Sequence, residues 1–146
     1  MCIFCEFIEG KRKRHTNGLP FKILNETKHT ISFFSIDFPE ASDGHMLVIP
    51  KKHFESIEHV PQYILTDLIS HVSLSSKVMK KNHDACNILL NNGKEAGQTV
   101  FHMHFHLIPR NEGDGIKIED WQRKDIDESY FNKMIRAFRS DFKNLS

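Results

Sequence analysis

The chain has 146 residues, enough for one domain with a substantial core but short for two. Its 20 lysines and arginines nearly balance 19 aspartates and glutamates, and this net charge of +1 favours neither nucleic acid nor an anionic membrane as a partner. No apolar run approaches the roughly 20 residues that span a bilayer, and the first residues lack a signal-peptide pattern. We expect one cytoplasmic domain over residues 1–146.

Three cysteines occur, and two of them, Cys2 and Cys5, form a C-x-x-C pair at the start of the chain. An odd number with this pairing fits free or metal-bound thiols in a reducing compartment better than a disulfide framework. Tetrahedral zinc needs four nitrogen or sulfur ligands, so the pair alone supplies half of such a site. Two unligated reduced thiols are the alternative.

Four consecutive basic residues come next: Lys11, Arg12, Lys13 and Arg14. We interpret this run as a solvated loop, which is the usual place for adjacent like charges. A phosphate-rich ligand or a nucleic acid is the sharper alternative. The balanced charge of the whole chain does not favour the nucleic acid.

Five strands and two long helices are predicted in an α+β arrangement with a largely antiparallel sheet. The predicted strands cover residues 21–24, 30–37, 46–49, 87–90 and 100–108. A helix begins near Pro61, and its apolar stripe is formed by Ile64, Leu65, Leu68, Ile69, Val72 and Met79. A closing helix carries its apolar face on Phe131, Met134, Ile135, Phe138 and Phe142.

The last predicted strand contains the most informative pattern in the chain. Its histidines are His102, His104 and His106, and they alternate with Met103, Phe105 and Leu107. This alternation is strand periodicity, so the histidines share one face and the apolar residues share the other. Because the apolar face requires a core behind it, the histidine row is expected to line a cleft or a metal site.

The residues 102–108 follow the pattern H-φ-H-φ-H-φ-φ, with φ apolar, and come one residue after Gln98, Thr99 and Val100. This segment resembles the signature of the histidine triad (HIT) family of nucleotide hydrolases and transferases. The resemblance implies a five-stranded antiparallel sheet with two main helices, and a homodimer whose sheets join into one. It also implies a purine nucleotide substrate and no organic cofactor.

Two branches of this superfamily fit less well. No additional zinc-finger domain follows, which disfavours the DNA-repair branch. The third histidine, His106, is not glutamine, which disfavours the sugar-phosphate uridylyltransferase branch.

A neutral imidazole can attack phosphorus through its free ring nitrogen, and a reference pKa of about 6.5 keeps most histidines neutral at pH 7. The resemblance assigns this role to His104, which would form a covalent nucleotidyl-histidine. His106 would hold phosphate oxygens and assist the leaving group, and His45 would support the nucleophile. Such preorganised groups stabilise the charge that develops in phosphoryl transfer.

The resemblance also implies contacts to the rest of the nucleotide. Gln98, Thr99 and the Val100 amide would bind the α-phosphate. Asp37, eight residues before the histidine at position 45, would bind both ribose hydroxyls, and Asn91 would lie near the phosphate and ribose. Apolar residues that could sandwich a purine, although an ordinary core is the simpler interpretation, are Phe7, Ile8, Phe34 and Ile36.

A subset of bacterial and archaeal HIT proteins binds structural zinc, and the resemblance completes the C-x-x-C pair in the same way. The implied ligands are Cys2, Cys5, His53 and His102. His102 would then be structural, while the other two histidines of the triad would be catalytic.

The predicted function is hydrolysis or nucleotidyl transfer at the α-phosphate of a purine nucleoside 5′-phosphate derivative, either a phosphoramidate or a dinucleoside polyphosphate. One alternative is a zinc metallohydrolase with His102, His104 and His106 as its three ligands. Another is a nucleotide-binding scaffold with vestigial catalysis. The sequence names neither the leaving group nor the preferred purine.

Overall fold

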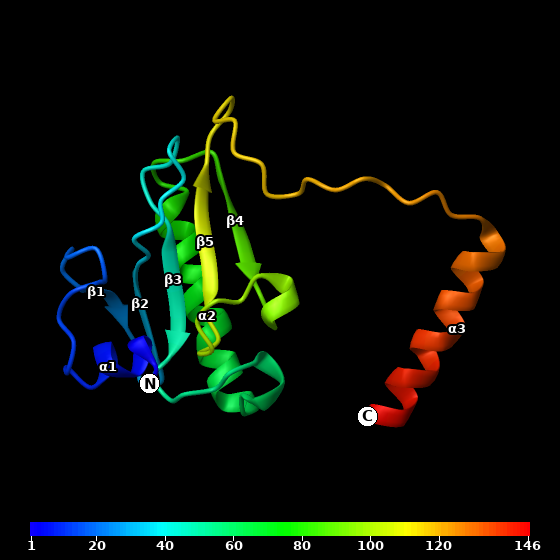
Figure 1. The fold of residues 1–146 in the computed structure, drawn as a ribbon, viewed down its shortest axis with the longest axis horizontal. Helices are drawn as coiled ribbons and strands as arrows, with labels where there is room; N and C mark the ends of the chain where they lie inside the picture. The colour runs from blue at the N-terminus through cyan, green and yellow to red at the C-terminus, as the bar shows by residue number, and fades with distance from the viewer. The chain divides into compact units, whose positions relative to one another are not determined.

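The computed structural model describes residues 1–146 and divides them into two compact units, Met1–Ile116 and Lys117–Ser146. The first unit contains a five-stranded antiparallel sheet in the order β1-β2-β3-β5-β4 (Figure 1). The strands are β1 (Ile23–Glu26), β2 (Thr30–Phe34), β3 (Met46–Pro50), β4 (Ala85–Leu90) and β5 (Phe105–Arg110). Its helices are α1 (Ile3–Ile8), η1 (Ile57–His59), α2 (Gln62–Met79) and η2 (Lys94–Ala96). The predicted α+β fold is confirmed.

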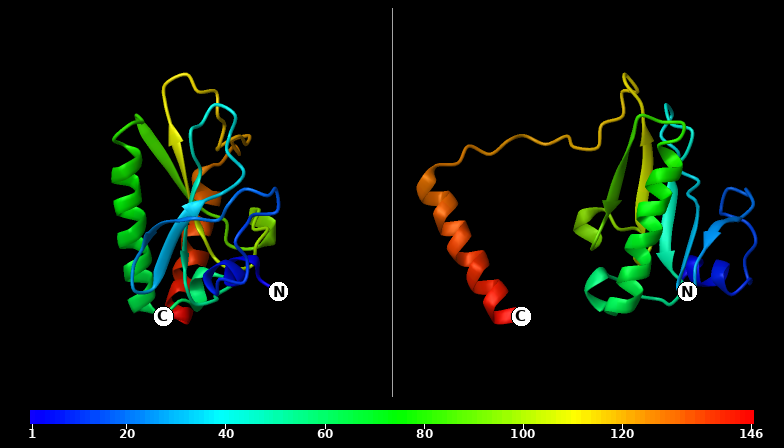
Figure 2. Two further views of the ribbon diagram at one scale, coloured as in Figure 1. Left: turned by 90° about the vertical axis from the view of Figure 1, so that its left-hand side faces the viewer. Right: turned by 180° about the vertical axis from the view of Figure 1, so that it is seen from behind.

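β3 lies at the centre of the sheet and is buried along its whole length. Met46 and Val48 pack with α2 on one face, whereas Leu47 and Ile49 pack with α1 on the other. Figure 2 shows α2 running along its face of the sheet. Burial on both faces explains why this strand is a continuous apolar run instead of an alternating one.

α2 begins one residue after Pro61, which occupies the N-cap position with a φ of −61°. The predicted apolar stripe is buried at Ile64, Leu68, Val72 and Met79. Ile69 departs from the prediction, because its side chain is 53% exposed at the margin of the stripe. The buried face of α2 is therefore narrower than the apolar stripe predicted from the sequence.

The strand that carries the histidines is shorter at its start than the predicted range 100–108. β5 begins at Phe105, where pairing with Val48 of β3 starts. Just before it, the Met103 amide donates to the Phe54 carbonyl at 2.7 Å, outside the sheet ladder. The alternation of faces still holds, since Met103, Phe105 and Leu107 are buried in the α2 cluster. His102 therefore lies in a bend and His104 in the irregular segment that leads into the strand.

The second unit contains α3 (Glu128–Leu145). Its N-cap is Asp127, whose carboxylate accepts from the Tyr130 amide at 2.8 Å. The predicted apolar face is present, but no residue of the helix is buried, and Phe138 and Phe142 are largely exposed. The structure divides into two compact units, and the expectation of one domain over residues 1–146 stays a prediction. No helix in either unit has the length and apolarity needed to span a bilayer.

Candidate metal centre and active site

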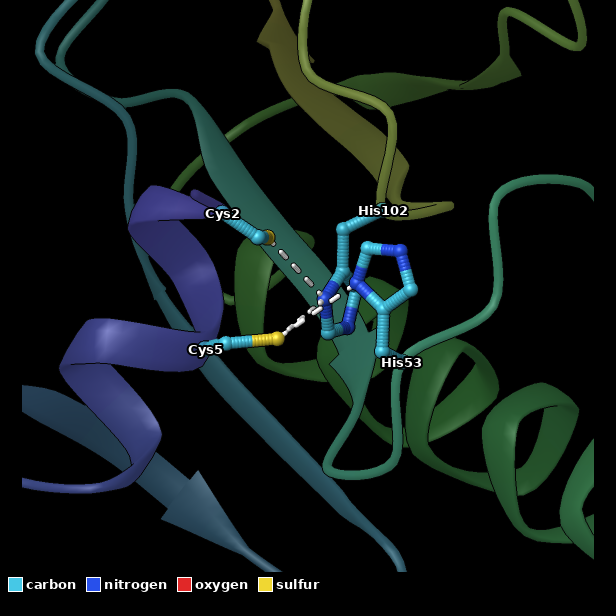
Figure 3. Close-up of side chains that lie close together, drawn as sticks. All are labelled: Cys2, Cys5, His53 and His102. Carbon is cyan, nitrogen blue, oxygen red and sulfur yellow. Dashed lines mark hydrogen bonds between the residues drawn. The ribbon is translucent and has the colours of Figure 1, made fainter.

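The first helix brings the two cysteines of the C-x-x-C pair to one side. Cys2 is the N-cap of α1 and Cys5 lies in its first turn, so their side chains are one helical turn apart. His53 follows β3 and His102 precedes β5, and both rings turn toward the helix (Figure 3). One ligand atom from each of the four residues lies within 4.8 Å of all the others. The structure thus brings together all four predicted metal ligands.

The spacing of these atoms fits a tetrahedral ion. Sγ of Cys2 lies 3.5 Å from Nδ1 of His102, while Sγ of Cys5 lies 3.4 Å from Nδ1 of His53 and 3.6 Å from Nδ1 of His102. Ordinary zinc–sulfur and zinc–nitrogen bonds place ligand atoms about 3.3–3.8 Å apart around a tetrahedron. Two sulfurs and two imidazole nitrogens are also a donor set that zinc prefers.

Two further features of the cluster favour a bound cation: the hydrogen bond that orients the His102 ring and the raised pKa of the Cys5 thiol. Nε2 of His102 donates to the Pro50 carbonyl at 2.8 Å, so Nδ1 carries the lone pair and faces the cysteines. Burial, followed by the hydrogen bond and charge of Cys2, raises the pKa of the Cys5 thiol to about 11. Two thiols this close become thiolates readily only when a cation is bound between them.

His104 has the opposite arrangement of its ring nitrogens. Its Nδ1 lies 2.7 Å from the His102 carbonyl oxygen. Because a carbonyl can only accept, Nδ1 carries the hydrogen and Nε2 keeps a free lone pair. The ring is 6% exposed, and burial lowers the pKa of His104, so it is neutral at pH 7. This is the protonation state that a nitrogen nucleophile requires.

His45 and His106 form a hydrogen-bonded pair beside His104. Nδ1 of His45 donates to the Asp37 carbonyl at 2.6 Å, and Nε2 of His45 lies 2.8 Å from Nδ1 of His106. Nε2 of His106 is buried without a hydrogen-bond partner. Burial, and then the nearby His104 and His45, lower the pKa of His106 to about 4. A buried nitrogen with no partner is available to a ligand.

These groups line one hollow of about 350 Å³ on the α1 face of the sheet. That volume lies within the range of small-molecule sites, about 300–1,000 Å³. Six of the predicted site residues line it: Asp37, His45, Thr99, Val100, His104 and His106. The structure therefore gathers most of the predicted nucleotide contacts around His104 Nε2.

Gln98 and Asn91 do not line this hollow. The Gln98 amide nitrogen donates to the carbonyls of Glu55 (2.8 Å) and Val100 (3.1 Å), and its oxygen accepts from the Gly93 amide (2.9 Å). Both of its hydrogens are used inside the protein, which leaves no donor for a phosphate. The side chain, 4% exposed, holds the loop that leads to the next residues of the site.

Some residues of the hollow were not singled out from the sequence, among them Phe4. Its ring meets His104 edge to face, with centroids 5.2 Å apart, and His102 at 5.8 Å. Phe4 lies inside the C-x-x-C pair, so an apolar residue between two predicted metal ligands was the available signal. Of the proposed base-sandwiching residues, Phe7 and Ile36 line the hollow, whereas Ile8, at the end of α1, is partly buried against the core cluster.

A family model described as the HIT domain matches residues 18–113. A HIT-like protein of Methanocaldococcus jannaschii, described as uncharacterized, is 41% identical over 131 residues, which is 88% of this chain and 95% of that protein. An adenosine 5′-monophosphoramidase of Saccharomyces cerevisiae is 35% identical over 91% of this chain and 77% of its own length. The chain belongs to the HIT family.

Solved structures agree with this assignment. A histidine triad nucleotide-binding protein from Candida albicans has a TM-score of 0.80 and 31% identity, with all of both chains covered. A zinc-bound histidine triad family protein from Mycobacterium smegmatis has a TM-score of 0.69 and 26% identity, over 99% of this chain and 97% of that one. The fold and the family that the sequence predicted are thereby confirmed.

Proposed function

We propose that this protein is a nucleotide hydrolase or nucleotidyl transferase acting at the α-phosphate of purine nucleoside 5′-phosphate derivatives. The observation that carries the proposal is the orientation of His104, whose Nδ1 is bonded to a carbonyl and whose Nε2 is a free, neutral nucleophile. The similarity to an adenosine 5′-monophosphoramidase supports an adenosine phosphoramidate as the first substrate to test.

In the proposed reaction, Nε2 of His104 forms a bond to the α-phosphorus while the bond from phosphorus to the leaving group breaks. His106, protonated through Nε2, gives that proton to the leaving nitrogen or oxygen. Water then attacks the nucleotidyl-histidine, the phosphorus–His104 bond breaks, and His106 recovers a proton from the water. An anionic phosphate raises the pKa of a nearby imidazole, which favours the protonated His106 in the complex.

The remaining residues bind the substrate in this proposal. The Thr99 hydroxyl and the Val100 amide donate to the phosphate, and the Asp37 carboxylate accepts from the ribose hydroxyls. Gln98 acts indirectly, because its hydrogen bonds fix the loop that presents Thr99 and Val100. Asn91 stays a proposed contact near the phosphate and ribose, outside the hollow that the other residues line.

We also propose that Cys2, Cys5, His53 and His102 hold a structural zinc ion. Bound there, zinc would supply four ligand bonds with no open position for water, so it would tie the chain start to the sheet and leave the reaction to the histidines. The His102 Nδ1 atom faces the cysteines, while His104 and His106 are not part of the cluster. This separation disfavours the metallohydrolase that uses all three histidines of the triad.

One experiment separates the candidate functions. Chelated protein that is still folded is mixed with radiolabelled adenosine phosphoramidate, and the label on the protein is mapped by mass spectrometry. Label on His104, absent in His104→Asn, supports the nucleophile. Complete inactivity that added zinc restores would establish the metallohydrolase instead, and nucleotide binding without any turnover would leave a scaffold protein.

We further propose a homodimer with a continuous sheet. β1 and β4 are the two edges of the sheet, and an open edge favours pairing with another strand. Light scattering of the purified protein should give about 34 kDa, twice the chain mass of 17.1 kDa. A monomer at every concentration tested would contradict this assembly.

A further inference from the structure

Residues 10–20, which contain the basic run, form an ordered hairpin in the structure. The His15 amide donates to the Leu19 carbonyl at 2.8 Å, and the Gly18 amide donates back to the His15 carbonyl at 3.0 Å. The Arg14 guanidinium also donates to the Gly18 carbonyl at 2.9 Å. Gly18 has a φ of +87°, which a glycine adopts without strain. The turn therefore fixes the backbone of His15. This residue lies outside residues 18–113, the range that matches the HIT family model.

The His15 ring is held by aromatic packing. Its centroid lies 5.0 Å from that of Phe7, 6.0 Å from Phe21 and 6.3 Å from Phe33. The hydrogen bonds of the hairpin use backbone groups, the Arg14 guanidinium and the Asn17 carboxamide, and leave both ring nitrogens free. Burial lowers the pKa of His15, so the neutral ring offers one donor and one acceptor.

This ring stands where two hollows meet. His15 lines the hollow around His104 and also a second hollow of about 420 Å³. The two hollows share two further residues, Ser35 and Ile36. The second hollow is otherwise walled by apolar side chains, namely Leu19, Pro20, Phe34 and Phe38.

The two hollows together offer a place for each part of a nucleotide. The proposed phosphate position at His104 and the proposed ribose position at Asp37 lie in one hollow, which shares walls with the second hollow. A planar base is the next group in the substrate. Apolar walls can sandwich a base but discriminate poorly between purines, because both purines present similar faces.

We infer that His15 contacts the base of the bound nucleotide through a ring nitrogen and determines which purine is preferred. The inference rests on the proposed function, because it places the phosphate at His104. A single fixed donor or acceptor discriminates between bases that differ in an exocyclic amino or carbonyl group, since the wrong base leaves a polar group unpaired. His15 would therefore be a specificity-determining residue that the family motif does not contain.

The test measures binding of three ligands to the full chain by titration calorimetry: AMP, GMP and ribose 5-phosphate. His15→Phe keeps the aromatic packing and removes both nitrogens. We expect it to change the ratio of the AMP and GMP dissociation constants by about 2- to 10-fold, the value of one neutral hydrogen bond. The dissociation constant of ribose 5-phosphate should stay the same. His15→Gln, which retains a donor and an acceptor, should restore part of the ratio.

A ratio that changes by less than twofold would overturn the inference, as would equal losses for all three ligands, which indicate packing alone. His15→Leu serves as the apolar variant if thermal unfolding shows that His15→Phe is not folded. Turnover of adenosine phosphoramidate by the wild type is measured in parallel. If turnover is present and the ratio is unchanged, only the base contact is wrong; if turnover is absent while the ratio changes, only the proposed function is wrong.

Discussion

His102 and His104 lie two residues apart and carry the same side chain, yet they present opposite ring nitrogens. His102 donates from Nε2 to the Pro50 carbonyl and turns Nδ1 toward the cysteines. His104 donates from Nδ1 to the His102 carbonyl and leaves Nε2 free. The position of the nearest carbonyl, and not the residue type, thus separates the proposed metal ligand from the proposed nucleophile.

His71 is a third buried histidine, and it is proposed neither as a metal ligand nor as a nucleophile. Nδ1 lies 2.7 Å from the Thr30 hydroxyl, and Nε2 lies 3.0 Å from the Ser32 hydroxyl. Both nitrogens are engaged within the protein, so neither is open to a metal or a substrate. A buried histidine in this fold is chemically available only where one nitrogen is left without a partner.

The largest expected effect comes from removing the free nitrogen of His104. His104→Asn should lower kcat by about 10⁴- to 10⁶-fold, the loss found when a nucleophile is removed from other enzymes. Nucleotide binding should be largely retained. Turnover of adenosine phosphoramidate and binding of AMP are measured together. His59→Asn, at an exposed histidine, is the control and should keep full activity. A His104 variant with a tenth of wild-type turnover would contradict covalent catalysis.

The proposed zinc site, which includes His102, predicts an effect of zinc on the stability of the protein. Metal analysis should give close to one zinc per chain. Zinc at a 1,000-fold excess over its dissociation constant should stabilise the wild type by about 4 kcal/mol, which corresponds to a rise in melting temperature of about 8–16 °C. Cys5→Ser should lose both the zinc and this response, while its His104 is still labelled below the melting temperature.

The matched control for the metal site is Cys86→Ser. Cys86 is the third cysteine and lies 3.3 Å from the Ser76 hydroxyl, outside the metal cluster. This variant should keep the zinc and its effect on the melting temperature. If Cys5→Ser responds to zinc as the wild type does, the four residues are not the metal site.

Asp37 sharpens the comparison because its carbonyl and its carboxylate have different proposed roles. Its carbonyl orients His45, and Asp37→Ala removes only the carboxylate. The variant should lose one or two charge-assisted hydrogen bonds to ribose, each worth roughly 1.5–3 kcal/mol. Binding of AMP should weaken accordingly, while a 2′,3′-dideoxynucleotide should bind wild type and variant alike.

Asp43→Ala, at an exposed aspartate in the same loop, is the control for this change. It should leave both dissociation constants unchanged. Equal weakening of the ribonucleotide and the dideoxynucleotide by Asp37→Ala would show that the carboxylate does not bind the ribose.

The smallest effect concerns His71 and pH. Burial lowers the pKa of His71. As the pH falls, the His71 ring therefore takes up a proton in the unfolded chain before it does so in the folded protein. Stability from this residue is present above the unfolded pKa of about 6.5 and is lost as the pH falls toward the lower folded pKa. The free energy of unfolding should fall by at most about 1.4 kcal/mol per pH unit on this account.

His71→Gln should reduce the slope of unfolding free energy against pH between about 6.5 and 5, as measured by urea titration. His83→Gln, away from this network, should keep the wild-type slope. Equal slopes in the wild type and His71→Gln would mean that folding does not lower the pKa of His71.

Much of the fold was accessible from sequence because apolar periodicity reports burial directly. This periodicity predicted the buried apolar face of α2 and the alternation of buried and histidine-bearing faces around Phe105. The start of β5 did not, because extended chain alternates its faces whether or not it pairs in a sheet. Phe21 likewise fits strand composition, but it stacks on Phe7 with centroids 4.2 Å apart and precedes β1.

The residue types of the site were also readable from the motif, but their hydrogen bonds were not. Gln98 carries a suitable donor, and only the structure shows that carbonyls at Glu55 and Val100 occupy it. His15 has no motif around it, and its position depends on a hairpin and on three aromatic rings from separate elements. Glu55 is distant in sequence from Gln98, as Phe33 is from His15, and the nearer partners depend on the geometry of the turns, so local pattern does not reveal them.

The acceptors that set the ring orientations of His102, His104 and His45 are all main-chain carbonyls, from Pro50, His102 and Asp37. A point substitution exchanges a side chain but keeps the carbonyl of the same residue. Evolutionary drift at these acceptor positions therefore leaves the proton arrangement in place as long as the backbone keeps its course. The proton arrangement of the three rings is therefore set by the path of the chain, separately from the roles proposed for the side chains of His102 and Asp37.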